Sequence, residues 1–151
     1  MITDHDRACM IIGNAVPTTG HKTLHPWEVA NLLREEGLLL ERDITSRRSW
    51  FKIAPSTWVL FWPPSCGLDW HDHGESWARF WVVSGELHET IRDQGHEFPW
   101  LLRAEHGVQL REPGSVHRLV NIGTTMAVSV HTYDPELVVA YDEALEIRPE
   151  R

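Results

Sequence analysis

The chain has 151 residues, 42% of them apolar and 24% charged, which are values typical of one folded domain. Its net charge of −8 repels phosphate backbones and anionic membranes, which argues against a nucleic-acid partner and against a membrane-bound protein. No apolar run approaches the roughly 20 residues that span a bilayer, and the first residues lack the basic-then-apolar order of a signal peptide. We therefore expect a cytoplasmic protein whose cysteines, Cys9 and Cys66, remain thiols.

The start of the chain is predicted to hold one helix. Residues 1–23 have the pattern of an irregular segment, with a turn at Pro17-Thr18-Thr19-Gly20. Between residues 24 and 37 the apolar positions follow a helical period, with Pro26 near the start and Gly37 just past the end. We therefore expect an irregular N-terminal segment followed by a short helix over 24–37.

From residue 45 to 135 the chain changes to short β-branched and aromatic runs separated by Pro, Gly and Asp. Many short strands at this spacing are typical of a β-sandwich or barrel. The predicted strands are 50–53, 57–62, 78–83, 87–91, 100–104, 108–110, 116–120 and 126–133. Residues 136–151 are expected to form a C-terminal tail, either as a last helix or as a wrapping segment. The predicted fold class is all-β, in a single domain over 1–151.

Three of the ten histidines are spaced in a way that suits a metal site. His71 and His73 are two residues apart, and side chains two apart along a strand point to the same side. His117 follows the turn residues Pro113-Gly114, which lead into a predicted strand. Neutral imidazoles are good ligands for transition metals, so these three residues are candidate metal ligands.

The three histidines lie in two stretches that resemble the two motifs of the cupin superfamily. The first stretch has Gly67, His71, His73 and Gly85, and the second has Gly107, Pro113, Gly114, His117 and Asn121. The resemblance implies a small jelly-roll β-barrel that binds a metal through the three histidines. Many cupins carry a glutamate ligand four or five residues after His-x-His, but Trp77 and Ala78 stand there, and Glu75 is too close to His73 to match. A three-histidine site is therefore implied.

A second cluster is predicted on the strand at 126–133. Ser129, His131 and Tyr133 alternate along this strand and are expected to share one face. A hydroxyl, an imidazole and a phenol in a row can form a hydrogen-bonded chain that fixes the imidazole tautomer and the orientation of the phenol. The alternative is an ordinary strand with a core tyrosine, which a neighbouring three-histidine site makes less attractive.

A three-histidine cupin with Ser-x-His-x-Tyr on a late strand resembles the cysteine dioxygenase family of thiol dioxygenases. The matching stretches are 71–74, 85–90, 116–121 and 129–135. The resemblance implies Fe(II) held by His71, His73 and His117, and addition of both atoms of O₂ to the sulfur of a small thiol. L-cysteine, giving a sulfinic acid, is the first candidate substrate.

The same resemblance assigns roles to further residues. Tyr133 would hydrogen-bond the bound substrate or oxygen, with His131 and Ser129 positioning it. Ala78 stands where mammalian-type members carry a cysteine joined to the tyrosine, so no such crosslink can form here.

Substrate choice in the family depends on an upstream arginine that pairs with the substrate carboxylate. Arg47 and Arg48 lie at about the matching distance before His71, and a gapped comparison places Lys52 there instead. A planar guanidinium suits this role because it can bind a carboxylate with two parallel hydrogen bonds. If none of the three faces the site, a thiol without a carboxylate, such as cysteamine, becomes the better candidate.

Several functions remain open at this point. The substrate could be 3-mercaptopropionate or another small thiol, and the metal could instead support an isomerase or a carbon-oxidising dioxygenase. A non-enzymatic binding cupin is the third class. The expected partners are a small thiol and O₂, with no nucleic acid and no membrane, and the expected state is a monomer or a small homo-oligomer.

Overall fold

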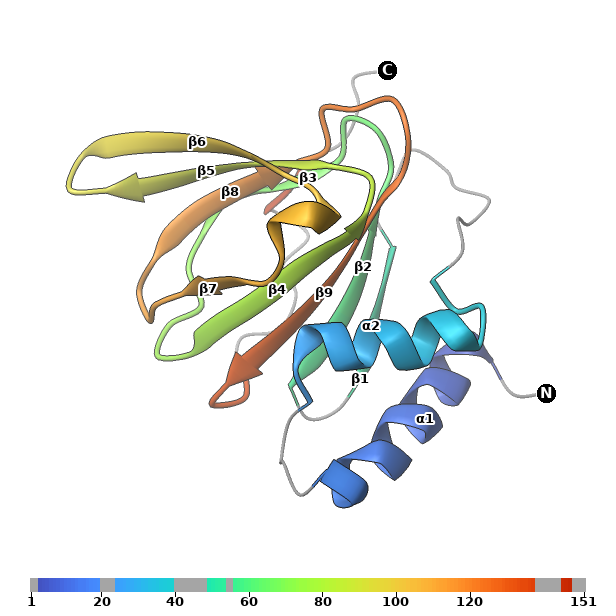
Figure 1. Ribbon diagram of the computed structural model, residues 1–151. Helices are drawn as coiled ribbons and strands as arrows, with labels where there is room; N and C mark the ends of the chain where they lie inside the picture. Colours follow the sequence, from blue (N-terminus) through green and yellow to red (C-terminus); the bar gives the residue numbers. More distant parts are fainter. Residues whose placement is uncertain (1–2, 20–23, 40–48, 54–55, 138–144, 148–151) are drawn as a thin grey trace.

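The computed structural model describes residues 3–19, 24–39, 49–53, 56–137 and 145–147 (Figure 1). In chain order the elements are α1 (Asp4–Thr19), α2 (Pro26–Glu35), β1 (Ser49–Ile53), β2 (Thr57–Trp62), β3 (Gly67–His71), β4 (Trp77–Ser84), β5 (Leu87–Asp93), β6 (His96–Leu102), the 3₁₀ helix η1 (Ala104–His106), β7 (Gln109–Arg111), β8 (Val116–Val120), β9 (Ala127–Asp134) and β10 (Glu146–Ile147). The strands form two antiparallel sheets, a first with the order β1-β2-β9-β4-β7 and a second with the order β10-β3-β8-β5-β6. The predicted all-β class is confirmed.

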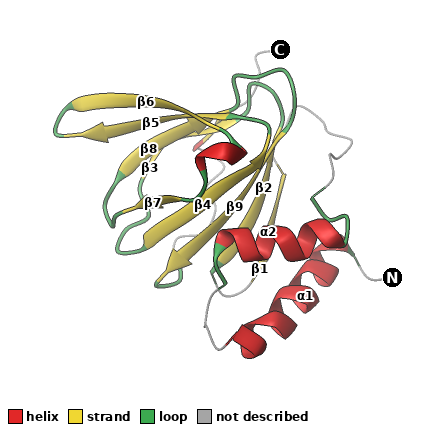
Figure 2. Ribbon diagram, viewed as in Figure 1, coloured by secondary structure: helices red, strands yellow, loops and turns green. Residues whose placement is uncertain are grey.

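The two sheets face each other (Figure 2), and an apolar core lies between them. Its buried members come from both sheets and are Leu60, Trp62, Phe80, Val82, Leu87, Leu102, Leu119 and Ala127. Side chains alternate along a strand, so the inward face of β8 continues from Leu119 to His117, and that of β5 continues from Leu87 to Glu89. The candidate site is therefore built on the continuation of the core.

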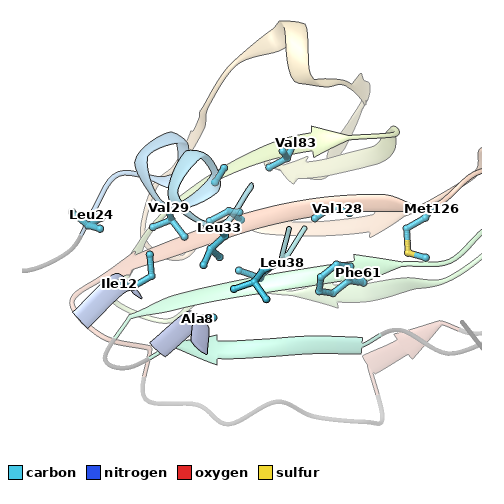
Figure 3. Packing of buried hydrophobic residues seen from close by; sticks show 13 residues of the cluster. Ala8, Ile12, Leu24, Val29, Leu33, Leu38, Phe61, Val83, Met126 and Val128 are labelled. Atoms are coloured by element: carbon cyan, nitrogen blue, oxygen red, sulfur yellow. The ribbon is translucent and has the colours of Figure 1, made fainter. Parts of the chain in front are cut away.

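Both helices lie on the outer face of the first sheet (Figures 1 and 2). The buried cluster between helices and sheet includes Ala8, Ile12, Val29, Leu33, Phe61, Val83 and Val128 (Figure 3). Because β2 has the helices on one side and the barrel interior on the other, all six of its residues are buried, which explains its unbroken apolar run. None of the described helices is long and apolar enough to cross a membrane.

The prediction of an irregular segment over residues 1–23 was wrong for residues 4–19, which form α1. Gly13 and Asn14 have low helix propensity, so the local signal for a helix is weak. Ala8 and Ile12, one turn apart, are nevertheless buried against α2 and the first sheet. Tertiary packing of this stripe thus supplies what local propensity lacks.

The predicted helix over 24–37 is present as α2. Pro26 occupies its first turn, and the Glu28 carboxylate accepts a hydrogen bond from the His25 backbone N–H at 3.1 Å. Gly37 adopts a φ of 71° directly after the helix, and the Leu38 N–H closes the end on the Leu33 carbonyl. The proline and glycine signals marked both ends correctly.

Three strand predictions need correction. β3 was not predicted as a strand, because a register shift between Leu68 and His71 interrupts its pairing and its polar residues hide the pattern. β6 begins at His96 and ends at Leu102, earlier than the predicted 100–104, because residues 104–106 form η1. The tail contributes β10, which pairs with β3 and so adds a strand outside the predicted 45–135 barrel.

β3 packs closely against β8 at Gly67, and this packing can be tested by substitution. A Cβ added at Gly67 would lie 2.3 Å from the Leu119 carbonyl oxygen and 2.9 Å from Val120 Cα, both backbone atoms of β8. We expect Gly67→Ala to lower the free energy of unfolding by about 1–3 kcal/mol in urea denaturation, as overpacking does elsewhere. The matched control is Gly13→Ala in α1, where no atom lies within 4 Å, which should stabilise by up to about 1 kcal/mol. Equal midpoints for Gly67→Ala and the wild type would contradict this packing.

Candidate metal centre

Three histidine rings converge at the end of β3. His71 is the last residue of β3, and His73 lies two residues beyond it. His117 is the cross-strand partner of His71 on β8. Their ring centroids are 5.1 Å apart for His71 and His73, 4.5 Å for His71 and His117, and 5.0 Å for His73 and His117. One nitrogen from each ring lies within 4.8 Å of the others. This is the cluster predicted from the spacing.

A tight turn beyond β3 brings His73 back to the other two rings. The Asp72 carboxylate accepts a hydrogen bond from the Gly74 N–H at 2.8 Å, and Gly74 has a φ of 57°, which favours glycine. The Gly74 carbonyl accepts a hydrogen bond from the Gly114 N–H at 3.0 Å. The turn after His-x-His is therefore tied to the turn that leads into His117.

Hydrogen bonds fix the tautomers of two of the rings. His71 Nδ1 lies 2.7 Å from the Asp69 carbonyl oxygen, and His117 Nδ1 lies 2.7 Å from the Glu89 carboxylate. A carbonyl or carboxylate oxygen can only accept, so Nδ1 carries the proton in both rings. The Nε2 lone pairs of His71 and His117 are then available to a metal.

The buried nitrogen atoms also fit a metal. Among the described residues, His117 Nε2 and His73 Nδ1 are buried side-chain atoms without a hydrogen-bond partner. Burial, together with the nearby His117 and His71 rings, lowers the pKa of His73 to about 3. The His73 ring is thus held neutral in a confined space, which is the state that metal ligation requires. The described cluster contains only these histidines, since Glu75 is exposed and lies outside it.

The sequence analysis missed a carboxylate behind His117. Glu89 is fully buried on β5, and Arg111 on β7 donates to both of its carboxylate oxygens, with Nε at 3.0 Å from Oε2. Burial alone would raise the pKa of the Glu89 carboxyl, but the hydrogen bonds from His117 and Arg111 outweigh it and lower the pKa. A glutamate at an inward position of the predicted strand 87–91 was the available signal.

The serine, histidine and tyrosine of β9 lie beside the candidate metal ligands. Ser129 Oγ is 2.7 Å from His131 Nε2, and the Trp62 indole N–H donates to the same hydroxyl at 2.7 Å. The Tyr133 ring stacks on His131 at 6.4 Å between centroids and lies 5.1 Å from the His73 ring. All four side chains are buried. The structure thus brings the second predicted cluster next to the first.

Phe80 and Ala78 of β4 complete the wall between the clusters. The Phe80 ring stacks on His131 at 5.2 Å and 8°, and its centroid is 6.1 Å from that of His117. Ala78 is the cross-strand partner of Tyr133 and packs in one cluster with it and Trp58. A methyl group therefore occupies the place from which a crosslink to Tyr133 would come.

Two of the three predicted carboxylate partners, Arg47 and Arg48, lie outside the described residues. The third, Lys52, pairs across strands with Trp58, and Trp58 pairs with His131. Lys52 is exposed, and its Nζ lies 5.4 Å from the Trp58 ring centroid. Lys52 therefore stands in the same cross-strand row as His131, at the edge of the sheet.

Several solved structures resemble the fold. An oxalate decarboxylase has a TM-score of 0.52 and 17% sequence identity, and the match covers 72% of this chain and 30% of the decarboxylase. An oxalate oxidase has a TM-score of 0.51 and 18% sequence identity, and the match covers 61% of this chain and 44% of the oxidase. CENP-C of Drosophila melanogaster, solved with CAL1, has a TM-score of 0.51 at 12% identity over 64% and 77%. The chain spans less than half the length of these oxalate enzymes, and such low identities show the fold alone.

Two facing antiparallel sheets with a three-histidine cluster between them define a small cupin with a site that fits a metal. No curated protein sequence matches this one. The cysteine dioxygenase type I family matches residues 49–144, more than half of the chain. The chain belongs to this family, which supports a dioxygenase-type enzyme.

The low pKa of His73 predicts how the metal-free protein responds to acid. An unfolded histidine takes up a proton near pH 6.5, whereas folded His73 does so only near pH 3. Between these values the unfolded chain binds the extra proton, so stability falls as the pH is lowered, by up to about 1.4 kcal/mol per pH unit. Urea unfolding of the metal-free protein from pH 7 to pH 4 measures this slope.

His73→Gln should make the slope measurably shallower, because it removes the titrating ring. The control is His96→Gln, which alters an exposed histidine of β6 and should leave the slope unchanged. Equal slopes for His73→Gln and the wild type would contradict the burial of a neutral imidazole.

Proposed function

We propose that this chain is an Fe(II)-dependent thiol dioxygenase, with L-cysteine as the first candidate substrate. The reaction adds both atoms of one O₂ to the sulfur, so that a thiol and O₂ give a sulfinic acid with no other reductant. The carrying observation is that the imidazoles of His71, His73 and His117 converge beside Tyr133. The match to the cysteine dioxygenase type I family supports the same reaction class. A cytoplasmic location suits an enzyme whose substrate must stay a reduced thiol.

The donor set supports a site for a ferrous ion and an anionic sulfur ligand. His71, His73 and His117 would hold the ion, which supplies the redox chemistry that activates O₂ toward the thiolate. The ligand set brings no negative charge of its own, because all three members are neutral imidazoles. A substrate thiolate would therefore be favoured as the neutralising partner.

Tyr133 is proposed as the residue that orients the substrate or the oxygen. Its ring lies against His73 on one side and stacks on His131 on another. The Ser129 hydroxyl is hydrogen-bonded to His131 Nε2 and accepts a hydrogen bond from the Trp62 indole N–H. These two bonds fix the His131 ring on which Tyr133 stacks. Such buried, hydrogen-bonded support keeps a phenol at one orientation.

The first test is O₂ consumption by protein loaded anaerobically with Fe(II), on adding L-cysteine, 3-mercaptopropionate or cysteamine separately. We expect stoichiometric O₂ uptake with one of these thiols and a sulfinic acid as the product. Tyr133→Phe should keep the iron and lower kcat about 10- to 100-fold, because the proposed hydrogen bond from the phenol to the substrate or oxygen is lost. His117→Ala should lose both iron and activity.

If protein that retains iron consumes no O₂ with any of the three thiols, the thiol reaction is contradicted. An isomerase or a carbon-oxidising dioxygenase would then be the better candidate. A chain that takes up no metal even after reconstitution would favour a binding cupin. Full activity of Tyr133→Phe would overturn the role given to the phenol.

The carboxylate partner is proposed among Arg47, Arg48 and Lys52. The position of Lys52 in the row that leads through Trp58 to His131 supports it as a candidate on the site's side of β1. Replacing the true partner by methionine should raise the KM for L-cysteine and 3-mercaptopropionate about tenfold or more, since a charged hydrogen bond is worth about 1.5–3 kcal/mol. The KM for cysteamine, which has no carboxylate, serves as the internal control and should not rise. Equal KM changes for all three thiols would contradict a carboxylate contact.

A further inference from the structure

Glu89 and Arg111 form a buried ion pair that joins the two sheets behind the metal centre. Glu89 lies on β5 of the second sheet and Arg111 on β7, the edge strand of the first. Their side chains are 0% and 12% exposed. Removing two charges from water is costly, and only close, well-aligned hydrogen bonds offset this cost. The arrangement of this buried pair is therefore of interest.

The pair is bidentate: two nitrogens of the Arg111 guanidinium fork donate to the two oxygens of the Glu89 carboxylate. Arg111 Nε donates to Glu89 Oε2 at 3.0 Å, and Arg111 Nη2 donates to Glu89 Oε1. Glu89 Oε2 also accepts the His117 Nδ1–H at 2.7 Å. Arg111 therefore fixes both oxygens of the carboxylate, and one of these oxygens fixes the ring of a metal ligand.

Arg111 is itself held by its surroundings. Its Nη1 donates to the Leu110 carbonyl at 2.8 Å, its Nη2 also reaches Gln109 Oε1 at 3.4 Å, and its guanidinium carbon lies 5.3 Å from the Phe80 ring centroid. With the two bonds to Glu89, these contacts engage four of the five N–H donors of a guanidinium. Arg111 is thus committed to the protein and poorly suited to bind a substrate carboxylate.

We propose that Arg111 is a positioning residue for the metal centre, holding Glu89 so that His117 keeps the tautomer and ring orientation that point Nε2 at the metal. The inference rests on the metal-dependent function proposed above and assigns Arg111 no contact with substrate. Without the fork, Glu89 is free to turn away from His117, and the imidazole loses its fixed acceptor.

The test measures Zn(II) affinity, because Zn(II) occupies three-histidine sites and supports no thiol oxidation. We expect Arg111→Met to weaken Zn(II) binding about 10- to 100-fold in competition with a chromophoric chelator, the usual effect of losing such an outer partner. Arg111→Lys should bind more tightly than Arg111→Met but less tightly than the wild type, since an ammonium cannot form the fork. The downfield NMR signal of the His117 Nδ1–H in the Zn(II)-loaded protein should broaden or move in both variants.

A double-mutant cycle separates positioning from a general loss of structure. In the Glu89→Gln background, Arg111→Met should weaken Zn(II) binding by a much smaller factor, because no carboxylate remains to be held. The matched control is Arg7→Met, which breaks an exposed arginine–glutamate pair between α1 and Glu36, at 3.2 Å and remote from the three histidines, and should leave the affinity unchanged. Thermal unfolding and near-ultraviolet circular dichroism of the metal-free variants check the fold.

Wild-type affinity and an unchanged His117 signal in Arg111→Met would overturn the inference. An undiminished effect of Arg111→Met in the Glu89→Gln background would also overturn it, because Arg111 would then act through another contact. If Arg111→Met does not fold, Arg111→Lys decides, and wild-type behaviour of that variant overturns the inference. A chain that oxidises no thiol but shows the expected Zn(II) affinities would contradict the proposed reaction while leaving this inference standing.

Discussion

The structure depends on bringing three imidazole rings together between two sheets that enclose an apolar core. Rings at centroid distances of 4.5–5.1 Å cannot all be protonated, because each charge would be desolvated and would repel the other two. Burial and the neighbouring rings lower the pKa of His73 to about 3, and the acceptors behind Nδ1 of His71 and His117 fix how these two rings are turned. What remains is a set of lone pairs directed at one point, an arrangement that a metal ion relieves.

Each sheet contributes a different half of the centre. The second sheet carries two of the candidate metal ligands, since β3 and β8 hold His71 and His117, and β5 holds the carboxylate behind His117. The first sheet carries the stacked His131 and Tyr133 on β9. Phe80 of β4 lies between the two halves and contacts a ring of each. The packing of the barrel therefore sets the separation between metal ligands and the proposed substrate-orienting residues.

Local spacing was enough to pair His71 with His73 and to place His117 at the start of a strand after a Pro-Gly turn, and the resemblance to the two cupin motifs joined the three into one cluster. The alternation of Ser129, His131 and Tyr133 was also readable from local spacing. Glu89 and Arg111 were not found, because their pairing depends on how β5 and β7 approach across two different sheets. The helix α1 and the strand β10 were missed because both are stabilised by distant partners, the outer face of the first sheet and β3.

The charges around the centre bear on which substrate it favours. Glu89 is the buried acid behind His117, and its charge is compensated by the guanidinium of Arg111 rather than offered to a metal. A divalent ion among three neutral imidazoles would then keep its full charge in a medium of low dielectric constant, where an unneutralised charge is costly. A bound thiolate would neutralise part of this charge at the metal itself. A glutamate ligand would do the same, but Trp77 and Ala78, at the positions where other cupins carry that glutamate, have side chains that cannot ligate. In the part of the chain that the structure describes, the cluster has no carboxylate ligand and the carboxylate behind His117 is compensated, and both features support the anionic sulfur substrate proposed above.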